Sequence, residues 1–114
     1  MPQEYNKNSQ QSRIEKIHSM LEQQPNDCFL LHALGLEQLK EGELQLAEQS
    51  FQRVLAVNES YVGTYYHLAK TQEKLNQPQV AIATYEKGIY IAQQVKDRHA
   101  QNELQMALDD LIDD

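Results

Sequence analysis

"LHALGLEQLKEGELQLAEQSF", residues 31–51, and "YYHLAKTQEKLNQPQVAIATY", residues 65–85, carry the same arrangement of apolar and small residues within a chain of 114 residues. Corresponding residues of the two stretches lie 34 positions apart. The pairs that keep this spacing are Leu34 and Leu68, Gly35 and Ala69, Gln38 and Gln72, Lys40 and Lys74, Ala47 and Ala81, and Phe51 and Tyr85. A fixed period of this length is typical of proteins built from stacked repeats.

Apolar residues recur at helical spacing along the chain, and turn-forming residues separate the helical segments. Asp27 stands where a helix N-cap is expected, and Gly42 and Pro78 fit the end of one helix and the start of another. No segment alternates with the period of two that marks a strand. The sequence therefore predicts an all-α chain of about six antiparallel helices.

The repeated pattern resembles the tetratricopeptide repeat, which has a period of 34 residues and fixed places for large and small side chains. The residues that carry the resemblance are Leu31, Leu34, Gly35, Ala47 and Phe51 in the first repeat and Tyr65, Leu68, Ala69, Ala81 and Tyr85 in the second. Pro25 fits the proline that closes a preceding partial repeat. The layout is similar to small free-standing bacterial proteins that have two such repeats between single helices. The resemblance implies a helical stack in which Gly35 and Ala69 let neighbouring helices approach closely.

This organisation predicts one domain at residues 10–114, preceded by a disordered leader at residues 1–9. Within the domain we expect a capping helix at 12–24, repeats at 28–61 and 62–95, and a C-terminal helix at 97–112. One repeat cannot bury its own apolar stripe, so each end helix should turn an apolar face inward. These faces hold Ile14, Ile17 and Leu21 at the front and Leu104, Leu108 and Leu111 at the back.

In this family the first helix of each repeat lines a concave groove, so the resemblance implies a partner-binding site there. The residues expected to line it are Phe29, His32, Leu36, Lys40, Tyr66, Lys70, Glu73 and Lys74. The apolar members can hold an anchor side chain, and the lysines can pair with carboxylates on a peptide or helix. A purely structural interpretation stands beside this one, because Leu36 can belong to the core and the lysines to a solvated face.

The charge balance limits the class of partner. Asp and Glu outnumber Lys and Arg by 17 to 10, which gives a net charge of −7. Such a surface repels phosphate backbones, so we expect no nucleic-acid partner. No apolar run approaches the roughly 20 residues that cross a bilayer, and the first residues lack the apolar core of a secretory signal. We therefore expect no membrane association and a cytoplasmic location.

Residues with chemical reactivity are few and dispersed. His18, His32, His67 and His99 fall on different predicted helices, so no two of them can be paired ligands on one helical face. Cys28 matches no zinc pattern, and its apolar neighbours favour a buried thiol over a reactive one. No nucleophile with an adjacent base can be assembled from these residues. The sequence predicts no enzyme, no cofactor and no metal.

These features favour a non-catalytic protein-interaction module, a monomer that binds a peptide or helix of a partner protein in its groove. The alternative is a structural unit that self-assembles through its end helices. A third hypothesis is metal or small-molecule binding by His32, His67 and Cys28. Some family members clamp the C-terminal carboxylate of heat-shock chaperones with Lys and Asn, but this chain has His32, Leu36 and Asp97 at those places, which disfavours that partner.

Overall fold

Six helices make up the chain in the computed structural model, which describes the backbone of residues 2–113 and the side chains of residues 13–113. Their bounds are α1 Pro2–Gln23, α2 Cys28–Lys40, α3 Leu44–Val57, α4 Gly63–Lys74, α5 Pro78–Val95 and α6 Arg98–Ile112. Residues 2–113 contain no strand. The predicted all-α class is confirmed.

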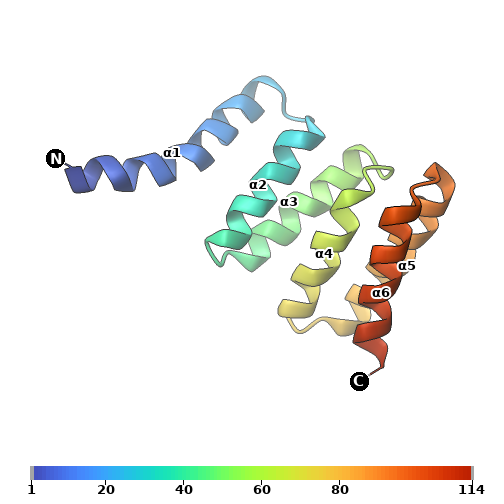
Figure 1. Ribbon diagram of the computed structural model, residues 1–114. Helices are drawn as coiled ribbons and strands as arrows, with labels where there is room; N and C mark the ends of the chain where they lie inside the picture. Colours follow the sequence, from blue (N-terminus) through green and yellow to red (C-terminus); the bar gives the residue numbers. More distant parts are fainter. Residues whose placement is uncertain (1, 114) are drawn as a thin grey trace.

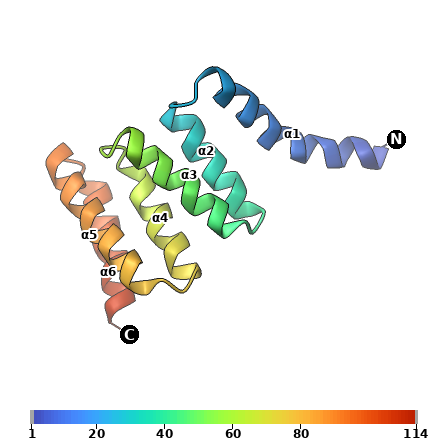
Figure 2. The same ribbon diagram turned by 180° about the vertical axis from the view of Figure 1, so that it is seen from behind.

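The helices form a stack in which each element packs against the next along the chain (Figures 1 and 2). The pairs α2 and α3, and α4 and α5, are antiparallel hairpins within residues 28–61 and 62–95. Helix α6 packs on α5 and also contacts α4, while α1 covers α2 at the other end. The helices α4 and α6 therefore lie side by side on one face of the stack.

Both hairpins close with the same backbone turn, one period apart. Gly42 and Asn76 have positive φ angles of 77° and 60°. After each of them, the amide of the next residue donates to a carbonyl five residues earlier: Glu43 N to Gln38 O and Gln77 N to Gln72 O, both at 2.9 Å. This left-handed closure satisfies the last carbonyls of α2 and α4 and returns the chain antiparallel.

Close contact within the first hairpin depends on Gly35. A Cβ atom at this position would lie 2.4 Å from Cε1 of Phe51, whose side chain is completely buried. The corresponding small residue of the second hairpin, Ala69, is also completely buried, as is Tyr85. The expected pairing of small residues with aromatic ones is confirmed.

A second close approach, at Gly88, was not expected from the sequence. A Cβ atom there would lie 2.7 Å from Cβ of Tyr65. The first repeat has Val54 and Leu31 at the positions 34 residues earlier, and both are completely buried. The second repeat thus places more volume on its first helix and less on its second.

Each hairpin also contains one polar pair that includes a buried glutamine. The hydroxyl of Ser50 donates to Oε1 of Gln38 at 2.6 Å, and the hydroxyl of Thr84 donates to Oε1 of Gln72 at 2.6 Å. The two bonds occupy equivalent positions, 34 residues apart. Gln38 and Gln72 are buried, and each side-chain oxygen is satisfied across its hairpin.

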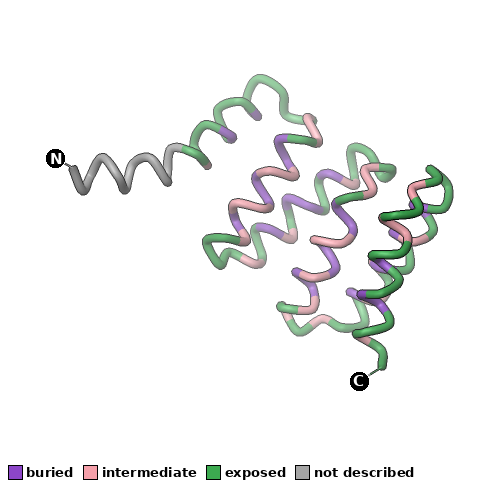
Figure 3. The backbone as a smooth tube through the Cα atoms, in the orientation of Figure 1, coloured by how far each residue is buried: buried purple, intermediate pink, exposed green. Residues whose placement is uncertain are grey.

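The ends of the stack are closed by α1 and α6. Ile17 and Leu21 of α1 pack with Leu30, Leu31 and Leu34 of α2, and Leu104 and Leu108 of α6 pack with Tyr65, Tyr85 and Ile91. Buried residues recur along α2 to α6, whereas most described side chains of α1 are exposed (Figure 3). The inward faces expected for the end helices are present.

Helix α1 begins at Pro2, and its side chains are described from residue 13. The disordered leader expected at residues 1–9 falls before the described side chains and stays a prediction. No Gly or Pro interrupts the chain between Pro2 and Pro25, and proline fits the first turn of a helix. Met1 and Asp114 lie outside the described residues.

Candidate groove between two neighbouring helices

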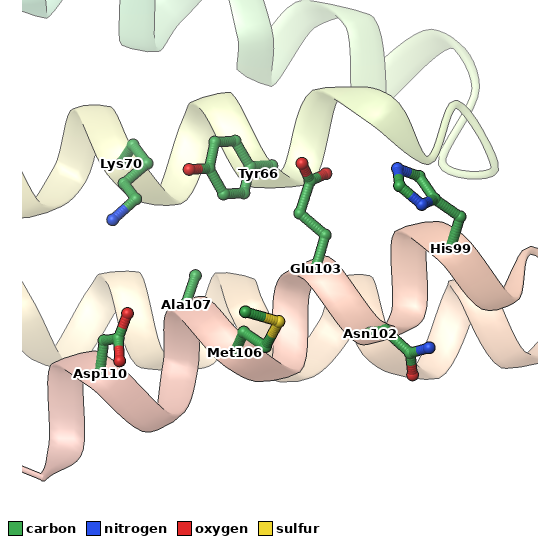
Figure 4. Close-up of a pocket in the computed structure, with 8 residues that line it drawn as sticks. All are labelled: Tyr66, Lys70, His99, Asn102, Glu103, Met106, Ala107 and Asp110. Carbon is green, nitrogen blue, oxygen red and sulfur yellow. The ribbon is translucent and has the colours of Figure 1, made fainter.

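A cavity of about 390 Å³ lies between α4 and α6 (Figure 4). Helix α4 contributes Tyr66 and Lys70, which were expected groove residues. Helix α6 contributes His99, Asn102, Glu103, Met106, Ala107 and Asp110. The groove therefore has one wall that the sequence predicts and one that it does not.

The wall formed by α4 carries an aromatic ring and a compensated positive charge. Nζ of Lys70 lies 3.7 Å from Oε2 of Glu73 and 5.8 Å from the centroid of the Tyr66 ring. An ammonium group at this distance from an aromatic face is attracted by it. The carboxylate of Glu73 also accepts a hydrogen bond from the hydroxyl of Tyr85. Lys70 and Glu73 thus belong to one local network on α4.

The wall formed by α6 is acidic and apolar. Glu103 points from α6 towards α4 beside Tyr66, and Asp110 lies near the other end of the cavity (Figure 4). Met106 is 68% exposed although it is a large apolar residue. Exposed methionine is an adaptable contact surface, because its side chain is unbranched and polarizable.

Sequence reasoning misses the α6 wall because α6 leaves the 34-residue register. Its buried residues Leu104, Ala107 and Leu108 follow Tyr65, Leu68 and Ala69 by 39 residues. Helix α5 has 18 residues, whereas α3 has 14, and this extension accounts for most of the shift. The spacing of the apolar residues in α6 indicates which face of this helix is buried. The remaining, exposed side of α6 could have been considered as a groove wall on that basis.

The junction of α2 and α4 holds a cluster of rings around His32. Its Nδ1 atom lies 2.8 Å from Oγ1 of Thr64, and its ring centroid lies 5.4 Å from that of His67 and 5.5 Å from that of Phe51. Burial lowers the pKa of His32, and the neighbouring His67 lowers it further. Burial also lowers the pKa of His67, while Glu103 opposes that shift. For both rings the largest effect, burial, favours the neutral imidazole.

The other expected groove residues occupy different environments. Phe29 is 70% exposed at the start of α2. Leu36 is half-buried and packs against the cluster of Ala47, Phe51 and Leu68, so its side chain belongs in part to the core. Lys40 pairs with Glu37, with Nζ 3.4 Å from Oε2. Lys74 is exposed.

The structure brings together Tyr66, Lys70 and Glu73, while Phe29 and Lys40 lie at opposite ends of α2.

Residues 13–113 contain no group of three or more His, Cys, Asp or Glu side chains arranged to hold a metal ion. The Sγ atom of Cys28 lies 3.7 Å from the carbonyl oxygen of Val54. Burial and the neighbouring Asp27 raise the pKa of the Cys28 thiol, which disfavours the reactive thiolate. Among the described helices, none combines the length and apolar character needed to cross a membrane.

The fold and the groove define a helical-repeat protein made of two hairpins and two end helices. Residues 62–95 match the family model of the tetratricopeptide repeat. A tetratricopeptide repeat domain protein from Salinibacter ruber is 37% identical, with a TM-score of 0.73, and the match covers 76% of this chain and 88% of that one. The chain belongs to the tetratricopeptide repeat family. No curated protein matches it at a significant level.

More distant structures share the fold along almost the whole chain. The TPR2B domain of yeast Sti1, in complex with pHsp70, is 12% identical with a TM-score of 0.84, covering 98% of this chain and 90% of that one. PcrH, in complex with the chaperone binding region of PopD, is 13% identical with a TM-score of 0.82, covering 96% and 84%. Both structures are similar to this chain in fold.

Proposed function

We propose that this protein is a non-catalytic protein-interaction module that binds a peptide or helix of a partner protein in the groove between α4 and α6. The observation that carries the proposal is the cavity of about 390 Å³ lined by an aromatic, an exposed methionine and charged side chains. Aromatic and methionine side chains in a recess are typical anchor sites for a partner's side chains. Rigid, well-packed helices on both sides preorganise such a site.

The fold supports a segment as the occupant rather than a small molecule. The cavity is open along two parallel helices, and its walls are formed by side chains spaced at helical intervals. A bound helix or extended peptide can place successive side chains along such a groove. The yeast Sti1 domain and PcrH, which share this fold, are each in complex with another protein or a region of one.

The test is selection of a displayed library of random peptides on the intact chain. Selected peptides should bind the intact chain and lose binding to the Tyr66→Ala variant, which removes the aromatic side chain of the cavity. The matched control is Tyr90→Ala, because Tyr90 is an exposed aromatic residue of α5 that does not line the cavity. If the selected peptides bind the groove variant as well as the intact chain, or if no peptide is selected, the groove is not the binding site.

A further inference from the structure

We propose that the groove between α4 and α6 selects a cationic and apolar segment, one that carries Lys or Arg next to a large apolar residue. This inference rests on the proposed function and adds the chemistry of the partner. It differs from the expectation of an acidic peptide held by the lysines of the groove.

The lysines expected to attract carboxylates are largely compensated within the chain. Nζ of Lys70 lies 3.7 Å from Glu73, and Nζ of Lys40 lies 3.4 Å from Glu37. Lys74 is exposed at the end of α4, outside the cavity lining. An acidic partner would have to compete with the intramolecular carboxylates, which reduces the net gain from each lysine.

The carboxylates of the α6 wall are not compensated in this way. Among residues 13–113, neither Glu103 nor Asp110 has an ion-pair partner within 4.0 Å. With Lys70 paired to Glu73, the cavity lining presents a surplus of negative charge. The chain as a whole has a net charge of −7, which further attracts a cation to this recess.

Asp110 is placed where the fold gains little from its charge. It lies in the last turn of α6, and the negative end of the helix dipole opposes a carboxylate there. Asp109 and Asp113 lie in the same part of the helix and make the electrostatic potential there more negative. A cationic side chain bound in the groove would relieve this repulsion, which gives it an interaction that a neutral or acidic side chain lacks.

The apolar part of the segment is defined by Tyr66 and Met106. These two side chains line the same cavity from opposite helices, with Ala107 as a small residue between them (Figure 4). An apolar side chain can enter between the ring and the thioether, and the cation of the segment can then lie towards Glu103 or Asp110. The cation and the apolar anchor therefore have separate places within one recess.

The experiment uses the peptides selected on the intact chain as probes. Their sequences should be enriched in Lys or Arg beside Leu, Met or Phe, and their affinities are measured by fluorescence anisotropy. The variant carrying Glu103→Gln and Asp110→Asn should bind them about fivefold to tenfold more weakly, as expected for two partly exposed ion pairs. The matched control is Asp109→Asn on the same helical turn, because Asp109 accepts a bond from Gln105 and does not line the cavity.

The outcomes separate the inference from the proposed function. Peptides that lose binding with Tyr66→Ala but are acidic, or that lose it with Tyr66→Ala and bind the α6 double variant unchanged, would overturn the inference and leave the groove as the binding site. An equal loss with Asp109→Asn would also overturn it, because the effect would then be general charge attraction. Selected peptides that bind every groove variant with the affinity of the intact chain would overturn both proposals. Circular dichroism checks that each variant keeps its helical content.

Discussion

Gly35 leaves no room for any side chain between α2 and α3. Its Cβ position lies 2.4 Å from the completely buried ring of Phe51, which cannot move without displacing its own neighbours. Gly35→Ala should therefore destabilise the protein by about 1–3 kcal/mol, although alanine favours helix by about 1 kcal/mol. Urea unfolding measures the difference.

The matched control is Gly63→Ala at the start of α4, where nothing lies within 4 Å of the Cβ position. This change should leave the free energy of unfolding unchanged or slightly higher. If both alanine variants behave alike, helix propensity rather than close packing decides the role of Gly35.

Leu68 and Lys70 are two positions apart on α4 but face different surroundings. Leu68 is 5% exposed and packs with Ala47 and Phe51, so Leu68→Ala should lower the free energy of unfolding by about 2–5 kcal/mol. Lys70→Ala should change it by less than about 0.5 kcal/mol, because surface ion pairs contribute little. Thermal or urea unfolding checks both values, and equal losses would contradict the assignment of faces on α4.

For single residues, the sequence predicts the packing role wherever the same kind of residue recurs after 34 positions. Gly35, Ala47 and Phe51 recur as Ala69, Ala81 and Tyr85, so their packing roles can be inferred. The contact of Gly88 with Tyr65 cannot be inferred in this way, since both residues differ in size from their counterparts. The partner of a side chain depends on three-dimensional neighbours that the spacing does not specify.

Among the elements, α2 and α3 begin differently. The side chain of Asp27 accepts a hydrogen bond from the amide of Leu30 at 3.0 Å, whereas Glu43, the residue before α3, makes no such bond. Asp27→Ala should therefore cost about 1 kcal/mol of stability. Glu43→Ala should cost much less. A similar loss for both variants, measured by urea unfolding, would show that the cap of α2 is not stabilising.

The junction of α2 and α4 makes stability depend on pH through its two histidines. The pKa values of His32 and His67 are lowered in the folded state, so the unfolded chain takes up protons first as the pH falls through about 6.5. Stability should therefore be full above about pH 7 and decline as the pH falls through about 6.5 towards the lower pKa values of the folded state. Urea midpoints across this range measure the slope.

The variant His32→Gln should reduce this slope, because it removes one of the two imidazoles while keeping a polar side chain beside Thr64. The control is His99→Gln, an exposed residue of α6. A slope that stays unchanged in His32→Gln would place the pH dependence elsewhere in the chain.

The boundaries of the helices could be predicted wherever a local signal marks them. Asp27, Gly42 and Pro78 mark helix ends, and the helices begin and end beside them. The register of α6 could not be obtained from the repeat, because the longer α5 displaces it. For this reason half of the groove was outside the set of residues expected to bind a partner.

For the whole molecule we expect a monomer. The self-assembly alternative needs the apolar face of α6 between two copies, but Leu104 and Leu108 are buried against α5 within one chain. Sedimentation over a range of protein concentrations should give a constant mass. A mass that rises with concentration would favour self-assembly, and Met106 and Ile112 would then be the exposed apolar side chains to substitute first.

The pairing of charged side chains across the molecule could not be predicted from the sequence. The lysines along the predicted groove suggested an acidic partner, yet Lys40 and Lys70 each pair with a glutamate on their own helix. Spacing of three residues permits such a pair without requiring it. The sign of the field in the groove therefore depends on which side chains meet, and this is known only from the structure.

The contact between Tyr65 and Gly88 makes the spacing of α4 and α5 depend on glycine at position 88. A Cβ atom at this position would lie 2.7 Å from Cβ of Tyr65 and 3.0 Å from Cδ1 of Leu104, so a larger residue would press on α4 and α6 at once. Tyr65→Leu would not relieve this clash, because leucine keeps the Cβ atom. The combination of Leu31 and Val54, both buried in the first hairpin, therefore cannot be transferred to positions 65 and 88. An exchange of hairpins within this stack would have to carry a whole interface across, and not a single pair of side chains.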